Sequence, residues 1–185
     1  MPPRRRASIE QEAHDILQSC AITEPPVDVK RIAEQLGYRV VLKFFDEEDL
    51  SGTVVRDDRG AVTLGINTLH PQVRQRFSIA HEIGHAWLHL ARATRESFFV
   101  DPPAGVFFRD SKASRGEDQK EIEANQFAAA LLMPSHLVHD CLAALAGSPR
   151  KLSIDTAVSE LATGFYVSTQ AMRFRLVTLG FIEPE

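Results

Sequence analysis

A short motif, His81-Glu-Ile-Gly-His85, lies within a long apolar stretch and constrains the fold more than any other feature. Residues four positions apart lie on one face of an α-helix, so the two imidazoles of this HExxH pattern can converge on a single metal ion. Glu82, beside the first histidine, is then placed to take a proton from a water molecule at that ion. The pattern predicts a helix over residues 71–91 with His81 and His85 as metal ligands.

The predicted helix has apolar side chains on nearly all sides, which is typical of a helix in a protein core. These side chains are Phe77, Ile79, Ala80, Ile83, Ala86, Trp87, Leu88 and Leu90. Polar groups buried among them need partners. A metal ion would give the two buried imidazoles a partner. The alternative is that both form hydrogen bonds to other residues of the core and bind no metal.

A third ligand has to come from elsewhere in the chain. His89 lies on the same helix face as His81, but about 12 Å away along the axis of a straight helix, too far to share an ion. The longer pattern HExxHxxGxxH is absent, because Leu88 and Ala91 stand where its glycine and third histidine would be. We therefore expect His89 to pack near the site or to support a ligand through a hydrogen bond.

The better candidates lie in a predicted helix over residues 119–133. Glu121 and Glu123 project about 200° apart around that helix, so only one can face the ion. Asn125 lies one turn after Glu121, and a buried amide there would suit the free N–H of a ligand histidine. This favours Glu121 as the third ligand with Asn125 beside it. Glu123 is the alternative ligand. Without a role at the metal, its negative charge would be explained by a favourable interaction with the helix dipole near the N-terminus.

The remaining patterns predict an α+β domain. The turn-rich residues 57–60 separate two runs rich in Thr, Val and Leu, which is typical of an antiparallel hairpin. Residues 94–118 predict a long irregular loop of the kind that often serves function. Further helices are expected at 7–20, 27–36, 135–146, 154–163 and 169–179, and strands at 38–45, 52–56 and 61–66. The expected fold is a small sheet of about three strands, partly antiparallel, packed on the buried HExxH helix.

A chain of 185 residues, 44% hydrophobic and 25% charged, is typical of one globular domain. We expect a single domain over residues 1–185, with a flexible tail at 1–6 and a C-terminal helical pair at 150–185. The two cysteines, Cys20 and Cys141, are far apart and match no disulfide or zinc-ribbon spacing. A reducing compartment is the expectation that follows.

Neither a leader nor a membrane span is expected. The basic residues 2–6 are followed by the acidic side chains of Glu10, Glu12 and Asp15 rather than by an apolar segment. The longest apolar run, residues 127–133, is far too short to cross a bilayer. We therefore expect a cytoplasmic protein without a membrane partner.

Residues 157–182 also resemble a helix-turn-helix, with Ser168 as the cap of the second helix. The net charge of the chain is −4, and the basic and acidic residues of 150–185 cancel. This is a poor electrostatic footprint for nucleic acid. We expect no direct nucleic-acid binding, and a helical pair that supports the fold or contacts a partner.

The motifs together resemble the ImmA/IrrE family of zinc metallopeptidases. The matching stretches are residues 74–89 and 121–134, with weaker similarity at 25–29 and 167–176. The resemblance implies a zincin-like fold in which His81, His85 and Glu121 bind zinc and Glu82 is the catalytic base. A site of two histidines and one glutamate also accepts manganese or iron.

The resemblance further implies a zinc-dependent endopeptidase that cleaves a helix-turn-helix transcriptional repressor and so relieves repression. The chain has no spare segment for such a module, so the repressor is expected to be a separate chain. The alternative is a non-hydrolytic regulator that binds a repressor or DNA through its C-terminal helices. Substrate-binding residues are not assigned, although an edge strand within 38–66 could bind an extended substrate. Candidates for stabilising the oxyanion are Tyr38, His70, Arg76, His89 and Tyr166.

Overall fold

The computed structural model describes residues 1–46, 50–90, 97–100, 115–147 and 153–184. Its helices and strands follow in the order α1 (Pro3–Ser19), α2 (Val29–Gln35), β1 (Arg39–Lys43), β2 (Gly52–Arg56), β3 (Val62–Asn67), α3 (Gln72–His85), the π-helix η1 (Ala86–Leu90), β4 (Ser97–Val100), α4 (Arg115–Leu132), α5 (Ser135–Ala146), α6 (Ile154–Phe165) and α7 (Thr169–Thr178). The α+β class predicted from the sequence is confirmed.

The strands form one mixed sheet in the order β1-β3-β2-β4. The predicted hairpin is present, because β2 and β3 pair antiparallel with Gly52 opposite Ile66. β1 pairs parallel with β3, and β4 pairs antiparallel with β2. β4 is a fourth strand beside the three predicted, in a stretch expected to be irregular. Four residues carry little strand signal by themselves, and here the edge of β2 decides their conformation. Residues 94–96 and 101–114 of that expected loop lie outside the described residues.

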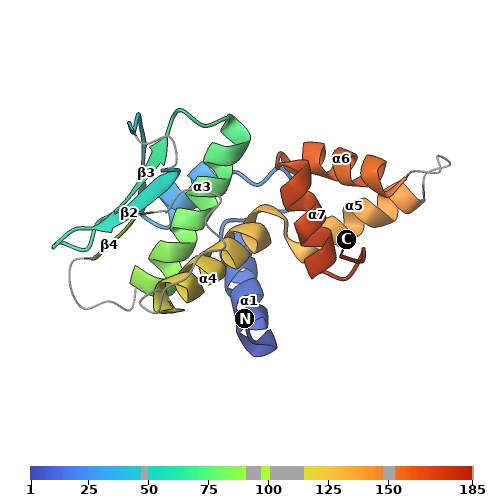
Figure 1. Cartoon of the computed structure of the whole chain (residues 1–185), viewed down its shortest axis with the longest axis horizontal. Coiled ribbons are helices and arrows are strands. Elements are labelled where there is room, and N and C mark those ends of the chain that lie inside the picture. Colours follow the sequence, from blue (N-terminus) through green and yellow to red (C-terminus); the bar gives the residue numbers. More distant parts are fainter. Residues whose placement is uncertain (47–49, 91–96, 101–114, 148–152, 185) are drawn as a thin grey trace.

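Helix α3 lies between the sheet and the helices α1 and α4 (Figure 1). Its buried residues run without interruption from Ser78 to His85, and Ile79, Ala80 and Ile83 are fully buried. This burial confirms the prediction made from the apolar residues around the helix. The HExxH motif therefore lies on a helix that packs against the sheet on one side and against α4 on another.

The N-terminal residues differ from the flexible tail predicted at 1–6. α1 begins at Pro3, a residue that suits the first turn of a helix because its missing N–H needs no partner there. Arg5 binds the carboxylate of Glu123 in α4 and lies 3.6 Å from that of Glu12. These ion pairs hold the first turn against α4, and a run of arginines gives no local sign of such a partner.

The C-terminal helices α5, α6 and α7 lie together on one side of the molecule (Figure 1). Ser153 and Ser168 cap α6 and α7 by accepting hydrogen bonds from the backbone of Thr156 and Ala171. The cap predicted at Ser168 is confirmed. The organisation of the whole chain as a single domain stays a prediction.

Arg175 in α7 links the C-terminal helices to the rest of the chain. Its side chain is fully buried, and its guanidinium donates to the carbonyl of Met133 at 2.8 Å. The same guanidinium binds both carboxylate oxygens of Glu10 in α1. One buried side chain therefore joins α1, the end of α4 and α7.

Within the described ranges, no single helix has both the length and the apolar composition of a membrane span, although the bent pair Gln119–Leu132 and Ser135–Ala146 meets both criteria together.

We predict that Arg175→Met lowers the free energy of unfolding by about 3 kcal/mol, because it leaves the Glu10 carboxylate without its buried cation. The matched control is Arg173→Met on the same helix, whose partner Asp155 is exposed. That change should cost less than about 1 kcal/mol. Urea unfolding followed by circular dichroism measures both, and equal losses would refute the role assigned to Arg175.

Candidate metal centre

Three side chains from two helices converge where α3 packs against α4. The Nε2 atoms of His81 and His85 lie 3.0 Å apart on one face of α3. Glu121 of α4 lies between them, with one oxygen 3.1 Å from His81 Nε2 and the other 3.0 Å from His85 Nε2. One ligand atom from each residue lies within 4.8 Å of the others. Two imidazole nitrogens and one carboxylate oxygen form a donor set that suits zinc, so the residues present fit that ion.

A close approach of α3 and α4 brings Glu121 to the histidines. A Cβ atom at Gly84 would lie 3.2 Å from both the Cα and the carbonyl oxygen of Ala124, and 3.1 Å from the ring of Phe127. Such distances are tighter than ordinary packing, so a side chain at position 84 would push the helices apart. Gly84 is one of the two variable positions of the HExxH pattern, so the pattern alone gives no sign that a glycine is needed there.

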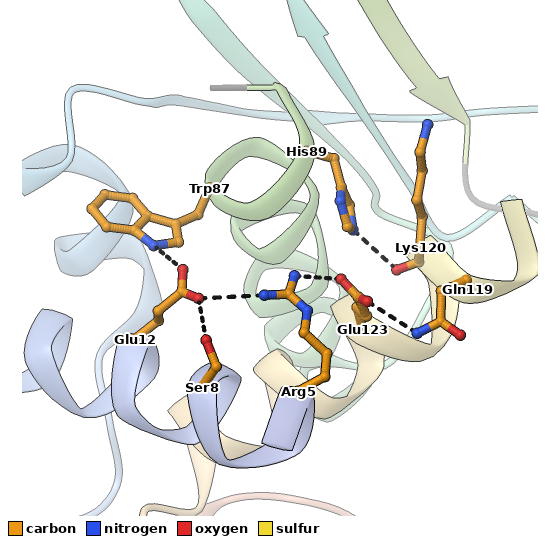
Figure 2. A network of polar contacts seen from close by, with 8 residues as sticks. All are labelled: Arg5, Ser8, Glu12, Trp87, His89, Gln119, Lys120 and Glu123. Carbon is orange, nitrogen blue, oxygen red and sulfur yellow. Dashed lines mark hydrogen bonds and ion pairs between the residues drawn. The ribbon is translucent and has the colours of Figure 1, made fainter. Parts of the chain in front are cut away.

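Glu123 faces a different part of the molecule from Glu121. Its carboxylate binds Arg5 of α1 and accepts a hydrogen bond from Gln119 at 2.9 Å (Figure 2). Of the two acidic residues considered from the sequence, the structure brings Glu121 to the histidines. The helical separation of about 200° between them accounts for this division.

The electrostatics of the cluster suit metal binding. Burial by itself raises the pKa of Glu121, but hydrogen bonds from His81 and His85 outweigh it and lower that pKa to about 2. Burial lowers the pKa of His85 more than its hydrogen bond to Glu121 raises it. At neutral pH Glu121 is therefore ionised and His85 is neutral, which are the forms that coordinate a metal.

Glu82 lies on the side of α3 that faces the sheet. The residue is fully buried. A Cβ atom at Gly52 of β2 would lie only 2.7 Å from its Oε1 atom. The carboxylate of the predicted base is thus held between the HExxH helix and the backbone of β2.

Comparison with known proteins identifies the family. The sequence profile of the IrrE N-terminal-like domain, a peptidase family designated M78, matches residues 33–177. The chain belongs to this family. An "uncharacterized immunity region protein 2" of Bacillus phage phi105 is 31% identical, over 52% of this chain and 59% of the phage protein. A Mycobacterium tuberculosis transcriptional regulator has a similar fold, with a TM-score of 0.60 and 16% identity over 92% of this chain and 47% of the regulator. The chain therefore spans about half the length of both proteins.

In this member of the IrrE-like family, α3 continues after His85 as the π-helix η1, where the sequence predicted an ordinary α-helix to residue 91. In η1 the ring of His89 donates to the carbonyl of Lys120, with 3.3 Å between Nε2 and the oxygen (Figure 2). Burial and the nearby His85 lower the pKa of His89 to about 4, so its ring is neutral at pH 7. His89 therefore contacts the backbone next to Glu121. Asn125 is half-buried one turn after Glu121, and its hydrogen bond to a ligand histidine stays a prediction.

Two of the residues considered for oxyanion stabilisation, Arg76 and Tyr166, contact each other. Arg76 donates to the carbonyl of Val27 at 2.9 Å, and its guanidinium lies 5.1 Å from the ring centre of Tyr166. The hydroxyl of Tyr166 donates to Gln72 at 2.7 Å. These contacts join α3 to the turn after α6. A role at the oxyanion stays a prediction for all five candidates, which are Tyr38, His70, Arg76, His89 and Tyr166.

We predict that Glu121→Gln weakens zinc binding by at least about 100-fold, because it removes a ligand rather than a supporting hydrogen bond. Glu123→Gln is the matched control, since it is the same change two positions along the same helix. It should bind one zinc ion per chain like the wild type. Isothermal titration of the metal-free proteins with zinc measures both affinities. Loss of zinc in Glu123→Gln with retention in Glu121→Gln would reverse the assignment.

Proposed function

We propose that this chain is a zinc-dependent endopeptidase that hydrolyses a peptide bond in a helix-turn-helix transcriptional repressor. The observation that carries the proposal is the convergence of His81, His85 and Glu121, with the buried carboxylate of Glu82 on the next residue of the same helix. Membership of a peptidase family supports the reaction class. The site residues keep the roles predicted for them from the HExxH pattern.

In the proposed reaction, the metal ion and the side chain of Glu82 have different roles. A zinc ion held by the two histidines and Glu121 would polarise the scissile carbonyl and acidify a water molecule. Glu82 takes the proton from the attacking water and passes it to the leaving amine, which is general acid–base catalysis. Burial suits this role, because it keeps bulk water away from the carboxylate during the transfer. The same donor set also accepts manganese or iron.

The proposed partner follows from the family and from one relative. The ImmA/IrrE resemblance implies a repressor as the substrate, and the phage relative is by name an immunity region protein. Such a repressor would be a separate chain, and its cleavage would take place in the cytoplasm, where transcription is regulated. The zero net charge of residues 150–185 argues against binding of DNA as the main activity.

We predict that the wild-type chain, loaded with zinc, cleaves a helix-turn-helix repressor encoded in the same genome, and that Glu82→Gln slows cleavage by about 100-fold or more. Glu34→Gln on the exposed face of α2 is the control and should cleave like the wild type. Gel electrophoresis with mass spectrometry of the fragments measures the rate and the scissile bond.

Equal cleavage by the wild type and Glu82→Gln would refute the proposed base. If none of the candidate repressors is cleaved, and the chain instead binds a repressor intact or binds duplex DNA with a steep salt dependence, the non-hydrolytic regulator replaces the peptidase.

A further inference from the structure

The position of the Glu82 carboxylate depends on a residue in the sheet. A Cβ atom at Gly52 would lie 2.7 Å from Oε1 of Glu82, 3.1 Å from Cγ and 3.2 Å from Cδ. Real Cβ atoms do not approach oxygen so closely, so with a side chain at position 52 either the strand or the carboxylate has to shift, and the carboxylate is at the movable end of its side chain. Both residues are buried, which leaves little space for the displaced group.

The backbone conformation at Gly52 does not itself require glycine. The glycines with positive φ among the described residues are Gly37, Gly60 and Gly180. Gly52 is instead an ordinary strand residue, in register with Ile66 of β3. Glycine weakens a strand interior, and it often marks a place where another group approaches the backbone closely. Here the approaching group is the Glu82 carboxylate.

The backbone at Gly52 is held in place by contacts of its neighbour Ser51. The hydroxyl of Ser51 accepts hydrogen bonds from Arg74, at 2.8 Å from Nη2 and 3.2 Å from Nε. The carbonyl of Ser51 accepts from the backbone N–H of Asn67 at 3.1 Å. The fully buried side chain of Asn67 donates in turn to the carbonyl of Leu50 at 2.7 Å. Residues 50–52 are thus fixed from both the helix and the sheet.

Arg74 belongs to the same helix as Glu82, about two turns earlier. α3 therefore carries the carboxylate and also the side chain that holds the backbone against which the carboxylate rests. We propose that Gly52 is a positioning residue for Glu82 and that Arg74, through Ser51, keeps Gly52 in that place. The proposal rests on the role of Glu82 in the proposed function and adds the elements that set its geometry.

The sheet provides a matched control. A Cβ atom at Gly65 of β3 would lie 2.7 Å from Oγ1 of Thr53, the same distance as at Gly52. Its first contact is therefore a threonine hydroxyl and not the carboxylate of Glu82. Gly65→Ala thus reproduces the crowding and the change of strand propensity without touching Glu82.

The first experiment determines crystal structures of the zinc-loaded Gly52→Ala and Gly65→Ala proteins. We expect the Glu82 carboxylate to move by at least about 0.7 Å in Gly52→Ala, to restore ordinary van der Waals distance. It should stay in place in Gly65→Ala. An unmoved carboxylate in Gly52→Ala would overturn the proposal, and this readout holds whether or not a repressor is cleaved.

The second experiment measures kcat and KM for the repressor cleaved by the wild type. Gly52→Ala should lower kcat by about 100-fold, the cost of a misplaced catalytic group, with little change in KM or in bound zinc. Gly65→Ala should keep kcat within about threefold. A loss of zinc or a rise in KM in place of the fall in kcat would show a merely structural effect.

A double substitution separates positioning from general damage. Aspartate is shorter by one methylene, so Glu82→Asp makes room for the Cβ atom of Gly52→Ala. We expect the double variant to retain at least about tenfold more kcat than the product of the two single effects, because contacting residues are not additive. If the fall in kcat of the double variant equals the product of the two single effects, the proposal is contradicted.

If Gly52→Ala does not fold, the proposal is tested by measuring kcat of variants at Arg74. Arg74→Met should lower kcat with zinc binding intact, and Arg74→Lys, which keeps a donor for Ser51, should recover most of the loss. Equal activity of Arg74→Met and the wild type would overturn the role of Arg74.

Discussion

The close approach of α3 and α4 at Gly84 and Ala124 is the contact on which the candidate metal centre depends. A carboxylate side chain is short, so Glu121 reaches both histidines only because the two helix backbones lie almost in contact. The rest of the arrangement supports this packing. Arg5 of α1 binds Glu123 on another side of α4, and His89 of η1 binds the carbonyl that precedes Glu121. The orientation of α4 is thus set by contacts on more than one side.

In the proposed site, one face of α3 carries the metal ligands and the neighbouring face carries the base. One face presents His81 and His85 to α4, where the ligand set is completed. The next face presents Glu82 to β2, where the backbone at Gly52 limits the position of the carboxylate. The metal ligands and the base therefore depend on different neighbours, and a change at Gly84 or at Gly52 should disturb one without the other. This separation comes from the turn of the helix itself, because adjacent residues project about 100° apart.

The local periodicities were sufficient to predict much of the fold. The hairpin of β2 and β3, the buried α3 and the helix that contains Glu121 all follow from patterns within a few turns of chain. The preference for Glu121 over Glu123 also rests on helical spacing alone, and the structure brings Glu121 to the histidines. β4 could not be predicted, because four residues acquire strand structure only when the edge of β2 is beside them.

The sequence by itself determined which residues could share a face: the histidine pair, the carboxylate next to it, and one of two glutamates on a later helix. Which residues share a helix face is a local property, because the helical repeat fixes it regardless of what packs around the helix. Only the tertiary structure decided the distances between elements. It placed residues 3–6 in a helix through the ion pair of Arg5 with Glu123, widened the helix at His89, and brought Gly52 against Glu82. Each of these depends on groups remote in the chain, whose approach is set by packing and not by the spacing of residues.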